Sequence, residues 1–301
     1  MNGGPAQLAS TGVTAGPYLV AKLQTLDTRL HEAEPRVLAT ERDEEACHDL
    51  RVALRRTRTV LEVGRSVLGR FQANEVRAAL RDLMRASGAL RDEEVLLGVV
   101  SSLGVDRPDV HGWIEARGRR ERVQRRILVR LVQTGELERG RRLLEALLAF
   151  RVDPSRDRRL AKFARRAVDR ARRDVERKRV AAPDDVSALH DLRIAYKRLR
   201  YTVETFEGAL PNDLAHLAQT AARFQKRLGD VHDVDVAIGA VRRARTLTEE
   251  GRADLLAALY RLRVDRIAAY ARERGVAIAA SVPPQARQAV GGESLRKIST
   301  R

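Results

Sequence analysis

Two stretches of this chain decide its fold: HDLRVALRRTRTVLE at residues 48–62 and HDLRIAYKRLRYTVE at residues 190–204. In both, apolar residues recur every three or four positions, which is the spacing of one face of an α-helix. The same periodicity runs through nearly the whole chain, and no segment alternates apolar and polar residues as an amphipathic strand does. We therefore predict an all-α protein of about ten helices joined by short loops.

Glycine and proline mark the places where we expect these helices to end. The predicted breaks fall at Pro35, Gly69, Gly88, 104–108, 134–135, 153–154, 182–183, 208–211 and Gly229. After Gly229, Asp230 and Asp233 have the spacing of a helix cap and its capping-box partner, and Asp92 matches Asp233. We interpret these acids as structural, and Arg91 as a cation beside a helix start, within reach of a phosphate.

A row of cations lies beside the apolar face of each stretch. At about 100° per residue, the buried face of the first helix is predicted to hold Leu50, Leu54, Thr57, Leu61 and Leu68. The cations beside that face are His48, Arg51, Arg55, Arg58 and Arg65. In the second helix the apolar face holds Leu192, Tyr196, Leu199, Val203 and Phe206, and the row holds His190, Arg193, Lys197 and Arg200. From His48 to Arg58 the row extends about 15 Å along the helix axis.

Each row carries a single acid, at its far end: Glu62 in the first and Glu204 in the second. Like charges three or four residues apart destabilise an isolated helix by about 0.2–0.5 kcal/mol per pair. A merely solvated face would therefore mix the two signs, whereas these rows do not. We interpret the rows as a surface for a polyanion, and the two glutamates as orienting carboxylates that each hold a neighbouring arginine in place.

The two rows belong to a longer duplication. Six residues of the first stretch recur 142 positions later: His48, Arg51, Arg55, Arg56, Arg58 and Glu62 correspond to His190, Arg193, Lys197, Arg198, Arg200 and Glu204. Further on, SGALRDEEVL from Ser87 matches LGDVHDVDVA from Leu228 at an offset of 141, which pairs Arg85 with Lys226 and Arg91 with His232. We predict two similar bundles related by a pseudo-two-fold axis, at residues 17–154 and 155–280. A disordered arm, 1–16, and a disordered basic tail, 281–301, are predicted to flank them.

The candidate binding residues are the cations of both shared elements. They are His48, Arg51, Arg55, Arg56, Arg58, Arg85, Arg91, His190, Arg193, Lys197, Arg198, Arg200 and Lys226. Each histidine lies in the first turn of its helix, where backbone N–H groups and the macrodipole favour an anion. A metal site is disfavoured, because each row has one histidine, no second histidine four residues on and no cysteine pair. We predict neither a metal nor a cofactor.

The net charge of +17 indicates an anionic partner. Only six of the 58 basic residues are lysine, and the arginines that make up the rest can grip phosphate with two parallel hydrogen bonds. We interpret most of the charge in the basic segments that begin at Arg117 and Arg170 as solvated surface. The single Cys47 excludes an internal disulfide, and the sequence shows neither a signal peptide nor a run apolar enough to span a membrane. We expect a cytoplasmic protein with no membrane partner.

The chain resembles the CHAD domain, the conserved-histidine α-helical domain, in HDLRVALRRTR, in HDLRIAYKRLRYTVE and in the Gly-then-Asp element that follows each. The resemblance covers about residues 17–275. It implies two four-helix bundles around a basic central channel, binding of inorganic polyphosphate and, in some members, association with polyphosphate granules. Carried over by position, the binding set is His48, Arg51, Arg55, Arg58, His190, Arg193, Lys197 and Arg200. Since no Glu-x-Glu-x-Lys signature of a triphosphate-tunnel domain is present, we expect a stand-alone binding module.

We expect this module to bind polyphosphate, or another phosphate polyanion, without catalysis, and two alternatives stand beside that expectation. The first is binding of a nucleic-acid backbone, against which stands the scarcity of aromatic residues that stack on bases: one Trp, five Tyr and five Phe. The second is hydrolysis of polyphosphate or triphosphate. That reaction normally needs a carboxylate cluster for Mg²⁺ or a phosphate loop, and the chain has no Gly-x-x-x-x-Gly-Lys-Ser/Thr motif.

Overall fold

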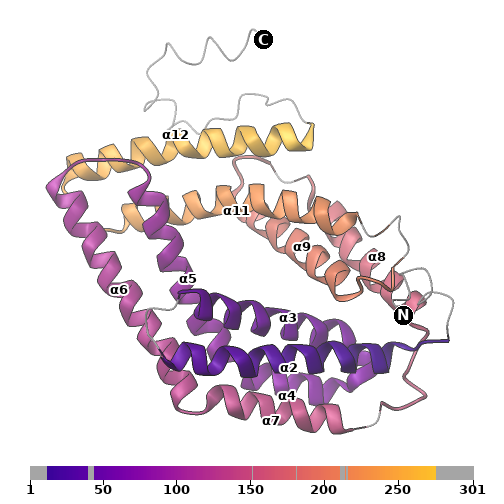
Figure 1. Cartoon of the computed structure of the whole chain (residues 1–301). Coiled ribbons are helices and arrows are strands. Elements are labelled where there is room, and N and C mark those ends of the chain that lie inside the picture. Colours follow the sequence, from indigo (N-terminus) through magenta and orange to yellow (C-terminus); the bar gives the residue numbers. More distant parts are fainter. Residues whose placement is uncertain are drawn as a thin grey trace. The chain divides into compact units, whose positions relative to one another are not determined.

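A computed structural model describes residues 12–39, 44–150, 152–180, 182–210, 214 and 216–275. Ten helices make up this part of the chain (Figure 1): α2 (Ala15–Ala39), α3 (Glu44–Leu68), α4 (Arg70–Ala79), α5 (Arg81–Ser101), α6 (Pro108–Gln133), α7 (Glu136–Ala149), α8 (Leu160–Lys178), α9 (Val186–Thr205), α11 (Leu217–Arg242) and α12 (Glu249–Arg274). The described residues form no strand beyond one isolated bridge between Thr14 and Arg159. The prediction of an all-α protein is confirmed.

The chain divides into two compact units, each assembled from three segments. Unit 1 comprises Met1–Arg91, Arg122–Val175 and Lys197–Ala221, and unit 2 comprises Asp92–Glu121, Glu176–Tyr196 and Ala222–Arg301. Helices α5, α6, α8, α9 and α11 therefore begin in one unit and end in the other. The predicted halves, 17–154 and 155–280, follow sequence repetition rather than compactness and stay a prediction. The predicted tail, 281–301, and residues 1–11 of the predicted arm lie outside the described residues.

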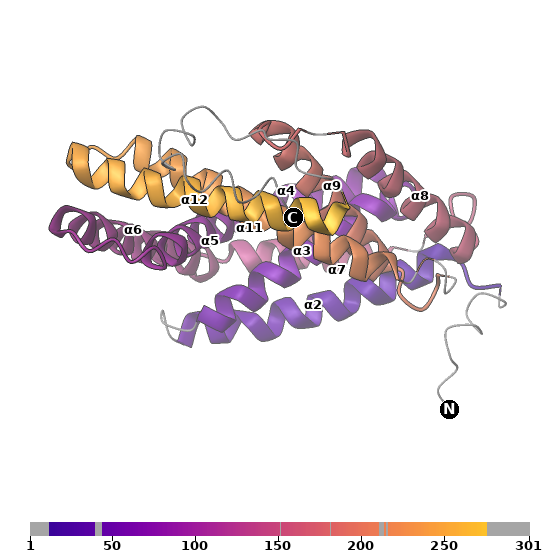
Figure 2. The ribbon, with the colours of Figure 1, turned by 90° about the horizontal axis from the view of Figure 1, so that it is seen from above.

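Unit 1 contains a ring of four helices in which α2 packs against α3, α3 against α4, α4 against α7, and α7 against α2. Figure 2 shows α2 beside α3 in this unit. Leucines at helical spacing fill this core, and their side chains are fully buried: Leu19, Leu23 and Leu30 of α2, and Leu50, Leu54 and Leu61 of α3. The chain ahead of α2 is tied to the chain ahead of α8, because the Ala15 N–H donates to the Arg158 carbonyl and the Leu160 N–H donates to the Val13 carbonyl.

An aromatic cluster in unit 1 closes over the end of α9. Phe206 is fully buried, with the Tyr18 ring stacked on it at 6.1 Å and the Phe163 ring edge-on at 5.9 Å between centroids. The Tyr18 hydroxyl donates to the carbonyl of Thr205. These contacts join α2, α8 and the end of α9.

Replacing Phe206 should therefore destabilise unit 1 strongly. We expect Phe206→Ala to lower the free energy of unfolding by about 3–5 kcal/mol, because the change removes a buried ring and leaves a cavity. Chemical denaturation followed by circular dichroism measures the loss. Phe71→Ala is the control, since that ring is 72% exposed in the same unit and its removal should cost under about 0.5 kcal/mol. Equal losses in the two variants would contradict the buried position of Phe206.

Unit 2 has its own core, built by parts of α5 and α6 together with α11 and α12 (Figure 1). Its buried members are Leu96, Val100, Val110, Trp113, Val234, Ala237, Ile238, Val241, Ala244, Leu247, Leu255 and Leu259. One carboxylate joins the starts of two of these helices. Asp109, in the first turn of α6, accepts hydrogen bonds from the Thr248 N–H and hydroxyl, and Thr248 caps α12 by accepting from the Gly251 N–H.

Three predicted helix breaks are wrong. Helix α2 continues through Pro35, α5 through Gly88 and α11 through Gly229. A glycine inside a helix costs only about 1 kcal/mol relative to alanine, which packing over a 26-residue helix such as α11 offsets. Both glycines have helical backbones with open space where a Cβ would lie. As a result Asp92, Asp230 and Asp233 lie inside helices and cap nothing, and Arg91 is not beside a helix start.

Candidate anion-binding site

Helix α3 places the first cationic row next to a fully apolar face. Leu50, Leu54, Thr57 and Leu61 are all fully buried, as the helical periodicity predicts. Thr57 occupies the position that corresponds to Leu199 in the second stretch. Its buried hydroxyl donates a hydrogen bond of 2.9 Å to the Ala53 carbonyl, one turn earlier on the same helix. Because this face is held in the core, Arg51, Arg55 and Arg58 beside it emerge at its edge and are partly buried, whereas His48 and Arg65 are exposed.

Two arginines at that edge have buried nitrogen atoms without a hydrogen-bond partner among the described residues. They are Arg55 and Arg58, and in each the atom concerned is Nε. Burial lowers the pKa of Arg55, and the neighbouring cations of Arg200 and Arg56 lower it further. Burial also lowers the pKa of Arg58. A buried guanidinium nitrogen that has lost its water without gaining a hydrogen-bond partner is costly in a folded protein, and an anionic ligand would supply the missing acceptor.

Helix α9 carries the second row, and its Arg193 repeats this condition in unit 2. The Arg193 Nε is buried without a hydrogen-bond partner in the described structure, and burial lowers the pKa of its guanidinium. The carboxylates of Asp233 and Asp92 raise that pKa in part. Asp233, which we interpreted as a capping-box partner, and its counterpart Asp92, which we interpreted as structural, therefore lie in the electrostatic surroundings of a predicted binding residue.

In unit 1 the far ends of the two rows meet. Arg56 of α3 lies 3.4 Å from the Glu204 carboxylate of α9, and Arg198 of α9 lies 3.9 Å from the Glu62 carboxylate of α3. Glu204 also accepts a hydrogen bond of 2.6 Å from Arg200 Nε, one turn earlier on its own helix. Each carboxylate thus contacts a cation of the opposite helix.

Three neighbours of this site were not predicted from the sequence. Arg77 of α4 lies 2.7 Å from Glu62, and both Arg77 and Arg81 of α5 add to the lowering of the pKa of Arg58. The ring of Tyr201 lies 4.8 Å from the Arg55 guanidinium and 5.5 Å from that of Arg200. No sequence motif marks the two arginines, because they lie on α4 and α5, outside the repeated stretches. Tyr201 lies inside the second repeat, and an aromatic residue next to arginines could have indicated a cation–π contact.

The prediction that both histidines lie in the first turn of their helices is wrong, because α3 begins at Glu44 and α9 at Val186, which places each histidine in the second turn. The two histidines also have different surroundings. His48 is exposed in the second turn of α3, whereas His190 is partly buried and its Nδ1 lies 3.2 Å from Nδ1 of His232 in unit 2. Which of the two nitrogens donates depends on the tautomer. His232 stands at the position that Arg91 occupies in the first copy, and this departure from the repeat was the signal for it.

Three further predicted residues lie on α5 and α11. Arg85, Arg91 and Lys226 are all exposed, and Arg85 forms an ion pair with Asp82 at 3.5 Å on its own helix. The remaining members, Arg51 and Lys197, are partly buried on the two row-bearing helices. The structure therefore groups Arg55, Arg56, Arg58, Arg198 and Arg200 in unit 1, and His190 and Arg193 in unit 2.

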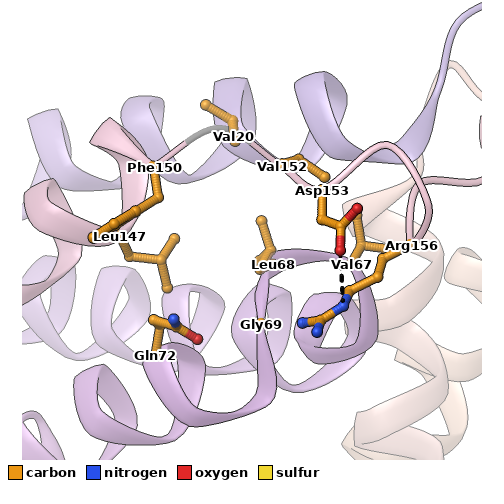
Figure 3. Close-up of a pocket in the computed structure, with 10 residues that line it drawn as sticks. All are labelled: Val20, Val67, Leu68, Gly69, Gln72, Leu147, Phe150, Val152, Asp153 and Arg156. Atoms are coloured by element: carbon orange, nitrogen blue, oxygen red, sulfur yellow. Dashed lines mark ion pairs between the residues drawn. The ribbon is translucent and has the colours of Figure 1, made fainter.

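The described residues contain no group of metal ligands, and the predicted cations do not line the pocket of unit 1. Within the described residues, no three His, Cys, Asp or Glu side chains lie close enough to hold a metal ion. A pocket of about 190 Å³ in unit 1 is lined mainly by apolar side chains such as Val20, Leu68 and Phe150, with an ion pair between Asp153 and Arg156 at its edge (Figure 3). No predicted site residue lines it. None of the described helices combines the length and apolar character that crossing a membrane requires.

Together, fold and site define an all-α protein that concentrates half-buried cations on two helices. The chain belongs to the CHAD domain family, whose model matches residues 23–242.

Solved structures share the fold. The CHAD domain from the plant Ricinus communis is 19% identical, with a TM-score of 0.70 over 89% of this chain and 94% of that one. PptA from Streptomyces chartreusis is 17% identical, with a TM-score of 0.63 over 92% of this chain and 99% of that one. No curated protein sequence matches the chain. At these identities the likeness shows the fold alone.

Proposed function

We propose that this protein binds inorganic polyphosphate through the cations of α3 and α9, without catalysing its turnover. One observation carries the proposal: Arg55, Arg58 and Arg193 each keep a buried guanidinium nitrogen without a hydrogen-bond partner in the described structure. All three belong to the duplicated rows. Arg77, Arg117 and Arg274, outside the rows, also have a buried Nε without such a partner, but Arg77 and Arg117 form ion pairs with Glu62 and Glu93. Buried cations are stable in proteins when they are paired, so their shared condition fits an anionic ligand with several charges.

Polyphosphate fits this site better than a nucleic acid does. Helix α3 has no aromatic residue, and both aromatic residues of α9, Tyr196 and Tyr201, are buried. The row-bearing helices therefore offer no exposed Phe, Tyr or Trp ring, and stacking of bases on such rings is how proteins commonly hold single-stranded nucleic acid. Polyphosphate carries closely spaced charges and no bases, so cations alone recognise it.

The resemblance to the CHAD family also implies a basic channel and association with polyphosphate granules. We propose that the repeated halves face one another across a basic channel, that the rows line it, and that bound polyphosphate recruits the protein to granules in the cytoplasm. Fluorescence microscopy of the tagged protein, with a polyphosphate stain, tests the last step. A tagged protein that stays diffuse in cells with stained granules would contradict it.

Competition binding tests the ligand. We expect long polyphosphate to bind at least about tenfold more tightly than duplex DNA or RNA at equal phosphate concentration and equal salt, because only polyphosphate needs no space for bases. Fluorescence anisotropy with a labelled polyphosphate and unlabelled competitors measures the ratio. Equal affinity for DNA would remove the preference on which the proposal depends.

The hydrolase alternative has a separate test. Phosphoryl transfer normally relies on carboxylate-bound Mg²⁺, and the described residues contain no group of three potential metal ligands. Phosphate release from polyphosphate, in the presence of Mg²⁺ or Mn²⁺, is expected to stay at the level of the protein-free control. Release that scales with protein concentration would replace the binding function with an enzymatic one.

A further inference from the structure

Two carboxylates of unit 1 each hold cations from more than one helix. Glu204 of α9 binds Arg200 at 2.6 Å and Arg56 of α3 at 3.4 Å. Glu62 of α3 lies 2.7 Å from Arg77 of α4, 3.6 Å from Arg65 and 3.9 Å from Arg198 of α9. Both side chains are about three-quarters buried, with exposed fractions of 27% for Glu62 and 23% for Glu204. Solvent therefore screens these ion pairs less than it screens pairs on an open surface.

The cross-helix contacts are the same contact made twice. Arg56 and Arg198 are equivalent positions of the duplicated pattern, and so are Glu62 and Glu204. The arginine of each helix meets the glutamate of the other. Because the same arginine–glutamate ion pair forms from each of the two equivalent positions, we interpret it as a general feature of the paired rows.

These carboxylates counter a repulsion that the rows create. Arg55 lies within the field of Arg200 and Arg56, and Arg58 within that of Arg77 and Arg81, each of which disfavours the charged state of its neighbour. Cations from three helices and from the start of α5 thus converge around two acids. Without a counter-charge, their repulsion would act to separate α3 from α9.

We propose that Glu62 and Glu204 are internal counterions that occupy these cations in the free protein and are replaced by the phosphates of a bound chain. The inference rests on the proposed function, because it assumes that the same cations receive a polyanion. It also predicts that an anion needs a minimum number of charges to bind at this site. A short anion offers few new contacts and meets the repulsion of two carboxylates, whereas a long chain offers enough contacts to outweigh both.

The test compares Glu62→Gln/Glu204→Gln with the wild-type protein by thermal unfolding. Glutamine keeps the shape of the side chain and removes the charge. We expect the melting temperature of the ligand-free variant to fall by about 3–6 °C, because the rows then repel one another uncompensated. Saturating long polyphosphate should raise the melting temperature of the variant by more than it raises that of the wild type, since the ligand supplies the missing counter-charge.

Asp27→Asn is the matched control. Asp27 forms a bidentate ion pair with Arg141 in the same unit, at 2.9 and 3.1 Å, and neither residue belongs to the rows. This variant should also unfold at a lower temperature, but polyphosphate should raise its melting temperature only as much as it raises that of the wild type. A purely structural role for Glu62 and Glu204 would give the glutamine variant the same behaviour as this control.

Binding selectivity supplies a second measurement. In the wild type, tripolyphosphate should bind far more weakly than long polyphosphate, and the ratio of the two dissociation constants should fall about tenfold in Glu62→Gln/Glu204→Gln. An unchanged ratio together with an unenhanced thermal shift overturns the inference while leaving polyphosphate binding intact. A wild-type protein that does not respond to polyphosphate overturns both. If the double variant does not fold, either single variant is expected to show the same two changes at about half the size on a logarithmic scale.

Discussion

The triple variant Arg55→Gln/Arg58→Gln/Arg193→Gln is expected to bind long polyphosphate about 1,000-fold more weakly than the wild-type protein. Each change removes one charge-assisted contact, and such a contact contributes about 1.5–3 kcal/mol, or roughly a factor of ten or more in affinity. These three side chains are chosen because their buried Nε atoms have no hydrogen-bond partner among the described residues. Isothermal titration calorimetry or anisotropy at fixed salt measures the loss.

A charge-matched control separates a site from the overall charge of the protein. Arg166, Arg170 and Arg173 are exposed on α8, and changing all three to glutamine removes the same three charges. We expect this control to bind within about threefold of the wild type, because exposed cations that make no specific contact add only a screened long-range attraction. Equal losses in the two triple variants would mean that net charge, and not the rows, governs binding.

The same triple variant should keep its fold. Burial lowers the pKa of all three arginines, so the protein spends free energy to keep them charged. Replacing them with neutral glutamine relieves that cost, and the ligand-free free energy of unfolding is expected not to decrease. A marked decrease would assign these arginines a structural role instead.

Salt should weaken polyphosphate binding steeply. We expect the association constant to fall about 1,000-fold or more between 50 and 200 mM monovalent salt, because a protein that makes six or more phosphate contacts releases a corresponding number of condensed counterions. A plot of log K against log salt concentration measures the number released. In the triple glutamine variant the slope should be smaller in magnitude by about 2–3. A wild-type affinity that is insensitive to salt would rule out recognition by summed ionic contacts.

Much of the fold was predictable because helix periodicity is a local property. The spacing of apolar residues predicted the all-α class, the number of helices and the buried face of α3, where Leu50, Leu54, Thr57 and Leu61 are all fully buried. Family membership followed from the doubled His-Asp-Leu-Arg pattern. The glycine rule failed at Gly88 and Gly229, because the local cost of one helical glycine is smaller than the gain from burying the rest of a long helix.

The candidate site was predictable only in part. The rows themselves could be derived, since the angle between a cation and the apolar face depends on sequence spacing alone. Arg77 and His232 could not, because each reaches its partner from another helix, and helical periodicity does not predict how two helices pack. Arg77 contacts Glu62 from α4, and His232 faces His190 from 42 residues away. The lengths of the loops and the packing of the helices decide such meetings, and no short-range pattern records them.

By itself, then, the sequence determined which side chains share a helix face: the leucines that enter the core, and the cations that emerge beside them in two matching rows. The tertiary structure decided which partners those cations have. It gave Arg56 and Arg198 a carboxylate from the opposite helix, and it buried the Nε atoms of Arg55, Arg58 and Arg193 without a hydrogen-bond partner in the described part of the chain. The physical reason is that helix periodicity is set within a turn or two, whereas burial and charge pairing depend on how separate helices pack.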